Sequence, residues 1–307
     1  MAAPHASASR DSFLPAREGG FATTDPKLLR HKRIDPALAD GWRTKLPPQP
    51  LEHATKLVAT TLLGYELDPQ VGRKERAELL PLGGGDDVAA DNPVIFVHDF
   101  TGQIYGLVAI ARKLGVSSVG IECSRRLLSG CKTVHDLAAR YVALLPLQQR
   151  ENVEPIRLVA YSFGCRIAYY MAQILEATGR MVQLVLLDGP IGADADNPAR
   201  FGGHAAPVIE ALQSRNPAAL PQGGARSLVE RLLSEGDGAA SVSAGLLELP
   251  DDGGAQHLHV STLYLSPPDS VMQSNGTFEN ARRCLPQMKH AVVGGGNHFD
   301  FVTRDAG

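Results

Sequence analysis

Residues 156–164 read Ile-Arg-Leu-Val-Ala-Tyr-Ser-Phe-Gly, and they decide the fold. The apolar run is typical of a buried strand, and the residues after it open a helical stretch that reaches about Ala177. A serine at such a strand–turn–helix junction forms a nucleophile elbow, whose strained backbone exposes the hydroxyl above the carboxyl end of a sheet. The elbow needs small residues two positions before and after Ser162. Ala160 and Gly164 meet that need, although glycine is more usual at the first position.

Strands and helices alternate on both sides of this motif. The first of these strands, residues 94–97, is continuously apolar, as in parallel sheets that are buried on both faces. The expected strands cover residues 94–97, 118–121, 156–160, 182–187, 259–265 and 290–293. Helices are expected over residues 104–114, 133–145 and 165–177. This order predicts an α/β protein with a mostly parallel, doubly wound sheet.

The rest of the chain lacks this alternation. Residues 1–90 are predicted to form an N-terminal tail or linker with one helix over 51–65, and residues 91–307 to form the main domain. Between about 191 and 256 the chain is rich in Ala, Gly, Pro and Leu. Long insertions after a strand in this fold class usually form lids or substrate walls, so we interpret this segment as a helical lid.

Composition excludes several classes of protein. A formal net charge of −3 over 307 residues gives no basic surface for nucleic acid. The four cysteines lack metal-ligand spacing, which favours free thiols in a reducing compartment. No apolar run reaches the roughly 18 residues of a membrane span. The N-terminal segment lacks the apolar core of a secretory signal and fits an organelle transit peptide only weakly, so a cytoplasmic location is expected.

A serine hydroxyl is a poor nucleophile near neutral pH. It needs a base within hydrogen-bond reach, and that base must be oriented by a carboxylate. His298 follows the last expected strand and the flexible sequence Gly-Gly-Gly-Asn, so we predict that it is the base. The rival is His98, at the end of the first strong strand, which we interpret as a structural or supporting residue.

Two aspartates compete for the role of the acid. Asp188 ends the strand that follows the elbow helix, whereas Asp269 follows a later strand, where many hydrolases carry their acid. Both positions point toward the same edge of the sheet, as ligand sites in open α/β sheets do. We favour Asp188 and keep Asp269 as the alternative.

The remaining site residues surround the serine. An oxyanion hole needs two backbone N–H groups, and we assign them to Phe163, directly after the nucleophile, and to Phe100, in the loop after the first strong strand. Tyr161, next to the nucleophile, is expected to line the substrate pocket. No metal site is expected.

Together these segments resemble the thioesterase domains of fatty-acid, polyketide and nonribosomal peptide synthases, which have the α/β-hydrolase fold with an inserted lid. The nearest likeness is to the thioesterase of animal-type fatty-acid synthase. Four segments carry the resemblance: Phe-Val-His-Asp-Phe-Thr-Gly (96–102), Gly-Ile-Glu-Cys-Ser-Arg (120–125), Thr-Val-His-Asp-Leu-Ala-Ala-Arg-Tyr (133–141) and Arg-Leu-Val-Ala-Tyr-Ser-Phe-Gly (157–164). The sequence departs from the family at Asp99, where proline is usual, and at Ala160, where glycine is.

The resemblance implies a serine thioesterase that removes an acyl chain from a carrier-protein phosphopantetheine, or from CoA, with Ser162, His298 and Asp188 as its triad. Integrated domains of this family carry the acid at the position of Asp188, whereas stand-alone editing enzymes carry it later, near Asp269. No cofactor is expected. The expected partners are acyl carrier protein or acyl-CoA, in or beside a multidomain synthase. Two alternatives remain open: a carboxylesterase or lipase that acts on oxygen esters, and a cyclising, macrolactone-forming thioesterase.

Overall fold

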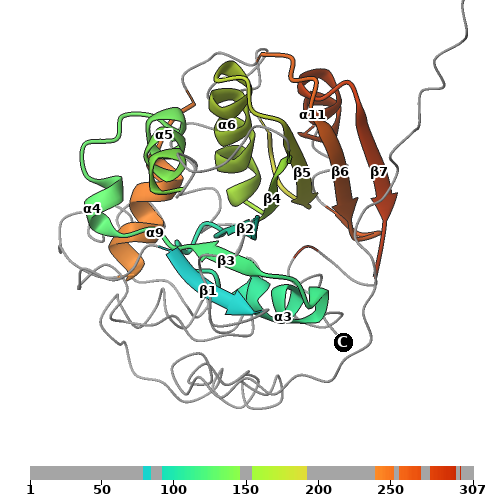
Figure 1. The fold of residues 1–307 in the computed structure, drawn as a ribbon. Helices are drawn as coiled ribbons and strands as arrows, with labels where there is room; N and C mark the ends of the chain where they lie inside the picture. The colour runs from blue at the N-terminus through green and yellow to red at the C-terminus, as the bar shows by residue number, and fades with distance from the viewer. Residues whose placement is uncertain are drawn as a thin grey trace, which may run out of the picture.

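The computed structural model describes residues 79–83, 92–145, 154–191, 239–251, 256–270, 277–294 and 298. Within these ranges, one sheet of seven strands runs in the order β1-β3-β2-β4-β5-β6-β7 (Figure 1). The strands are β1 (Leu79–Gly83), β2 (Val94–Val97), β3 (Ser118–Ile121), β4 (Ile156–Tyr161), β5 (Val182–Leu187), β6 (Ser261–Ser266) and β7 (Met288–Val292).

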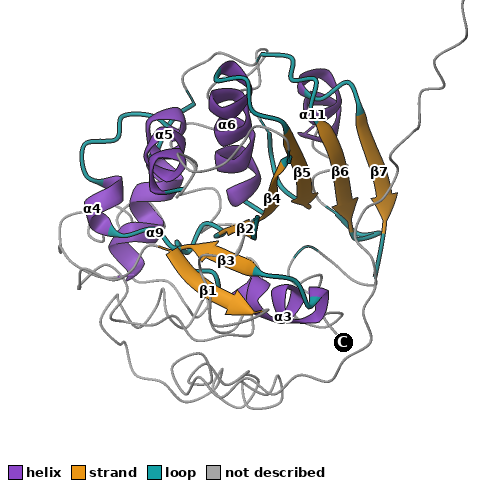
Figure 2. Cartoon of the chain, in the orientation of Figure 1, coloured by secondary structure: helices purple, strands orange, loops and turns teal. Residues whose placement is uncertain are grey.

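The described helices flank this sheet (Figure 2). They are α3 (Tyr105–Leu114), α4 (Arg125–Leu128), α5 (Val134–Leu144), α6 (Gly164–Ala177), α9 (Ala239–Glu248) and α11 (Thr277–Cys284). Every neighbouring pair of strands from β3 to β7 is parallel, and only β1 pairs antiparallel, with β3. The predicted α/β class and the mostly parallel sheet are therefore confirmed.

Strand β4 shows how the sheet is buried on both faces. Leu158 and Ala160 belong to the hydrophobic cluster that includes α5 and α6, whereas Val159 and Tyr161 belong to the cluster that includes α3. Successive side chains of a strand point to opposite faces, so an unbroken apolar run fits a strand that is covered on both sides. This double covering explains why the central strands could be recognised from their sequence.

Two helices begin at recognisable caps. In α5, Thr133 accepts a hydrogen bond from the backbone N–H of Asp136, and the Asp136 carboxylate accepts one from the N–H of Thr133. This reciprocal capping box fixes the start of the helix, as the sequence predicts. In α4, the Ser124 side chain accepts from the N–H of Leu127. This short helix was not predicted, nor was α11.

The predicted tail needs a correction, because Leu79–Gly83 forms β1 at the edge of the sheet. The strand contains Pro81, and its register shifts between Pro81 and Gly83. Proline cannot donate to a strand ladder and is tolerated only at sheet edges or bulges, so the segment did not stand out as a strand. The predicted helix over 51–65 lies outside the described residues.

The predicted lid is described mainly over residues 239–251. There, α9 packs against α4, and Val242 and Leu246 are buried in the same hydrophobic cluster as α5 and α6. This end of the segment is thus part of the core, and a role as a lid stays a prediction. Among the described helices, none is long and apolar enough to cross a membrane.

Candidate active site

The strand order of the sheet brings two loops together. The chain passes from β2 to β3 on one side and later to β4 on the other side of β2, so the strand order switches direction between β2 and β4. Open α/β sheets bind ligands at the carboxyl ends of strands beside such a switch point. Ser162 follows β4, and residues 98–102 follow β2. The candidate site therefore lies where this fold class places its ligands.

Ser162 adopts the strained backbone of a nucleophile elbow. Its φ is 52°, in the left-handed region that non-glycine residues rarely occupy. The turn is packed so closely that a Cβ at Gly164 would lie 2.1 Å from the carbonyl oxygen of His98. A Cβ at Gly189 would lie 2.0 Å from the carbonyl oxygen of Ser162. Only glycine fits at either position, which explains the small residue two places after the serine.

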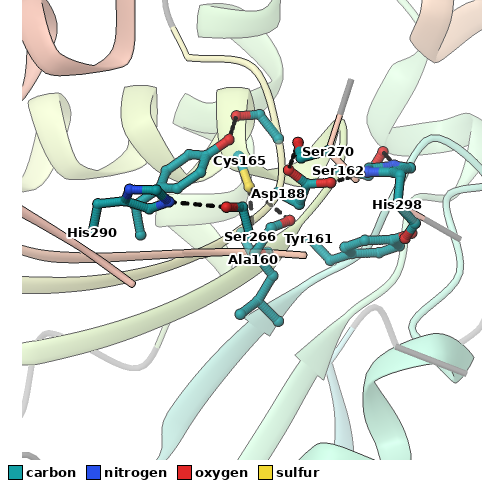
Figure 3. A network of polar contacts seen from close by, with 12 residues as sticks. Ala160, Tyr161, Ser162, Cys165, Asp188, Ser266, Ser270, His290 and His298 are labelled. Atoms are coloured by element: carbon teal, nitrogen blue, oxygen red, sulfur yellow. Dashed lines mark hydrogen bonds and ion pairs between the residues drawn. The ribbon is translucent and has the colours of Figure 1, made fainter. Parts of the chain in front are cut away.

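Three predicted residues form a continuous chain of contacts (Figure 3). His298 Nε2 lies 3.0 Å from Ser162 Oγ, and His298 Nδ1 lies 2.8 Å from Asp188 Oδ2. A carboxylate only accepts, so the Nδ1–H donates to Asp188 and leaves Nε2 to accept the proton of the serine hydroxyl. The exposed fractions are 9% for Ser162, 6% for His298 and 0% for Asp188. This is the geometry of a Ser-His-Asp triad.

The structure brings Asp188, and not Asp269, to the histidine. Asp188 directly follows β5 and has a φ of 44°. Its second carboxylate oxygen, Oδ1, accepts a hydrogen bond from the hydroxyl of Ser270. Asp269 is exposed and, within the described residues, makes no hydrogen bond to His298. Ser270, adjacent to the rejected acid, was not singled out by sequence reasoning.

The loop after β2 carries Phe100, one of the two predicted oxyanion donors. Asp99 Oδ1 accepts from the backbone N–H of Thr101 at 2.8 Å and from its hydroxyl at 2.5 Å, and the Gly102 N–H donates to the Asp99 carbonyl at 3.1 Å. Such a side-chain turn fixes the backbone of the loop. Phe163 caps the start of α6, where N–H groups have no partner within the helix. Phe163 directly follows Ser162 and Phe100 lies in this fixed loop, and their role as oxyanion donors stays a prediction.

His98 is a structural residue, as the sequence analysis interpreted it. It is fully buried, with Nδ1 2.5 Å from the Asp99 carbonyl oxygen and Nε2 2.5 Å from the Tyr141 hydroxyl. A carbonyl only accepts, so Nδ1 carries the proton and Nε2 accepts from Tyr141. Burial lowers the pKa of His98 to about 4, which keeps the ring neutral.

The structure places Tyr161 against His298, and its expected role in lining the substrate pocket stays a prediction. Its side chain is only 1% exposed and packs in the cluster that includes α3. The ring stacks on the imidazole of His298, with centroids 5.0 Å apart and planes inclined by 23°. The hydroxyl donates to the backbone carbonyl of His298 at 2.8 Å. The side chain of Tyr161 thus contacts both the ring and the backbone of His298.

Cys165 is a poor candidate for a rival nucleophile. Cys165, in the first turn of α6, is buried, and this burial raises the pKa of its thiol far above the usual range. All four cysteines are free thiols. Within the described ranges, no three His, Cys, Asp or Glu side chains gather closely enough to hold a metal ion.

Comparison with known proteins agrees with this fold. Residues 115–201 match the family model of the thioesterase domain. The structure is similar to YbtT, a type II thioesterase from the yersiniabactin NRPS/PKS pathway, with 15% identity, 75% of this chain and 94% of that chain covered, and a TM-score of 0.52. RedJ matches with 18% identity, 76% and 91% coverage, and a TM-score of 0.51. A four-domain nonribosomal peptide synthetase, AB3403, matches with 15% identity, 97% and 26% coverage, and a TM-score of 0.50.

These comparisons define the class of protein. The chain has the α/β-hydrolase fold, and the resemblance to thioesterase domains is confirmed by the family match over residues 115–201. The match supports an enzyme that acts on thioesters, by hydrolysis or by cyclisation. The closer likeness to the thioesterase of animal fatty-acid synthase stays a prediction.

Proposed function

We propose that this protein is a serine thioesterase that releases an acyl chain, fatty-acyl or polyketide, from the phosphopantetheine of a carrier protein or from CoA. The observation that carries the proposal is the chain of contacts from Ser162 through His298 to Asp188, at 3.0 and 2.8 Å. Ser162 and Asp188 lie within the thioesterase family match over residues 115–201. A serine with an oriented base is what acyl transfer through a covalent intermediate requires.

Acylation begins when Ser162 Oγ attacks the carbonyl carbon of the thioester while His298 Nε2 takes the hydroxyl proton. The tetrahedral intermediate carries its negative charge near the backbone N–H groups of Phe100 and Phe163. Each such donor contributes about 3 kcal/mol to the transition state in other serine enzymes. When the intermediate collapses, the C–S bond breaks, the proton passes from His298 to the departing sulfur, and the acyl group remains on Ser162 as an ester.

Deacylation repeats the same proton transfers with water. His298 takes a proton from water as the water oxygen attacks the ester carbon, and it returns that proton to Ser162 Oγ when the C–O bond breaks. The products are the free acid and the regenerated serine. Asp188 accepts the Nδ1–H throughout and stabilises the imidazolium that forms twice in each cycle.

The decisive experiment measures thiol release from acyl-CoA and acyl-pantetheine substrates of stepped chain length, from butyryl to stearoyl. Wild type and Ser162→Ala are compared, after circular dichroism has shown that the variant is folded. We expect release with a chain-length optimum in the wild type and a loss of at least about 10³-fold in the variant. Trapped acyl-enzyme, detected as a mass increase on the peptide that contains Ser162, identifies the nucleophile directly.

The same acyl chains offered as oxygen esters separate the proposal from its rivals. A kcat/KM higher for oxygen esters than for thioesters would replace the thioesterase with a carboxylesterase. A hydroxyacyl thioester that leaves as a lactone rather than as the acid would make the enzyme a cyclising thioesterase. Activity that remains in Ser162→Ala would remove the triad from the mechanism altogether.

A further inference from the structure

His298, the base of the candidate triad, is contacted by its two catalytic partners at its ring nitrogens in the hydrogen bonds described above. Asp188 and Ser162 each contact one ring nitrogen of His298. The plane of the imidazole and the backbone of His298 depend on contacts beyond these two.

Tyr161 supplies two such contacts. Its hydroxyl donates to the backbone carbonyl of His298 at 2.8 Å, which holds the main chain. Its ring stacks on the imidazole at a centroid distance of 5.0 Å and an interplanar angle of 23°, which holds the plane of the ring (Figure 3). One side chain thus restrains both the backbone and the ring of the base.

Tyr161 is itself held firmly. It is the last residue of β4, pairs with Leu187 in the parallel ladder, and is almost completely buried. It also directly precedes Ser162. The residue that supports the base and the residue that carries the nucleophile are therefore adjacent in the chain, which ties the position of one group to that of the other.

We propose that Tyr161 is a positioning residue that sets the distance and orientation of His298 relative to Ser162. This inference rests on the proposed function, since it assigns His298 the role of base. Tyr161 does not touch the reacting atoms. It acts by keeping Nε2 of His298 within reach of the serine hydroxyl, because proton transfer requires a heavy-atom distance of about 3 Å.

The test compares Tyr161→Phe with the wild type. Phenylalanine keeps the stacked ring and removes only the hydrogen bond to the carbonyl. The matched control is Tyr169→Phe, which removes a hydrogen bond from a buried tyrosine to the backbone carbonyl of Gln256, away from the triad. A second variant, Tyr161→Leu, removes both contacts. Native circular dichroism is verified for each protein before kinetics.

Two rates are measured: thioester turnover, and covalent labelling of Ser162 by an alkyl fluorophosphonate, which needs the activated serine but no thioester. We expect Tyr161→Phe to lower kcat and the labelling rate constant by the same factor, roughly three- to tenfold, with KM nearly unchanged. Tyr161→Leu should lower both rates further. Tyr169→Phe should leave both at the wild-type values.

Equal labelling rates in the wild type and Tyr161→Phe would overturn the proposal, even if the melting temperature of the variant fell, because the tyrosine would then only fill the core. A wild type that labels at Ser162 but turns over no thioester, together with slower labelling of Tyr161→Phe, would overturn the proposed substrate and uphold the positioning role. A wild type that does not label at Ser162 would overturn both.

Discussion

Two histidines, each contacted by a buried tyrosine, have different hydrogen-bond partners at their ring nitrogens. In the loop after β2, the Tyr141 hydroxyl donates to Nε2 of His98, and the neutral backbone carbonyl of Asp99 accepts from Nδ1. In the candidate site, the Tyr161 hydroxyl donates to the backbone carbonyl of His298, so Nε2 stays available to Ser162. The Asp188 carboxylate accepts from Nδ1. In the proposed mechanism, the partners, rather than the residue type, decide which imidazole acts as a base.

The largest expected effect comes from giving His298 a neutral partner, like the one that His98 has. Asp188→Asn should lower kcat by about 10⁴-fold, because an amide neither stabilises the imidazolium nor selects the tautomer with the proton on Nδ1. Steady-state kinetics of thiol release measure the loss. The matched control is Asp269→Asn, which changes an exposed aspartate and should retain wild-type turnover. The reverse pattern in the two variants would make Asp269 the acid.

The buried, neutral His98 should make the stability of the protein depend on pH. The pKa of His98 is about 4 in the folded protein and near its ordinary value of 6.5 when unfolded. Between these values only the unfolded state binds the proton. The free energy of unfolding therefore keeps its full value above about pH 6.5 and falls by about 3 kcal/mol as the pH drops toward 4. Urea unfolding at stepped pH measures the slope. His98→Gln, which cannot titrate, should flatten it, and an unchanged slope in this variant would contradict the assignment.

Tyr141→Phe should destabilise the fold by about 2 kcal/mol, because it leaves a buried ring nitrogen of His98 without its donor. Thermal or urea unfolding measures the loss. Tyr169→Phe is again the control for the loss of a buried tyrosine hydroxyl as such. A loss no larger than that of the control would mean that the contact between Tyr141 and His98 adds little to stability.

Ser270→Ala should have a smaller effect on catalysis than the replacement of Asp188. It removes the donor to Oδ1 of Asp188 and leaves the contact of Oδ2 with His298 in place. The loss of one hydrogen bond to a charged group corresponds to roughly a tenfold decrease in kcat. Ser270→Thr keeps a hydroxyl and should recover most of the activity. Failure of the threonine variant to exceed the alanine variant would show that the hydroxyl is not what matters.

Much of the fold and the core of the site could be predicted from the sequence, for reasons that are local. Apolar runs identify strands that are covered on both faces, and the serine motif fixes a strand–turn–helix junction. Chain order then places an acid and a histidine after later strands. Each of these inferences uses short segments, and the contacts of Ser162, Asp188 and His298 agree with them.

The supporting residues could not be predicted, because their roles depend on contacts between distant segments. Tyr161 and His298 are 137 residues apart, and Ser270 and Asp188 are 82 apart. Strand alternation indicates which face Tyr161 occupies, but no local pattern shows that His298 packs there. Strand β1 was missed for a different reason. It contains Pro81 and a shift in register, and such a strand becomes recognisable only when its partner β3 is known.

The left-handed backbone of Ser162 has a consequence for evolution and for engineering. A non-glycine residue in this region costs on the order of 1 kcal/mol, and glycine relieves that cost. Ser162→Gly should therefore be inactive yet more stable than Ser162→Ala, as differential scanning calorimetry of the two variants would show. Selection for heat resistance alone would favour loss of the nucleophile, so activity and thermostability must be screened together whenever this protein is evolved in the laboratory.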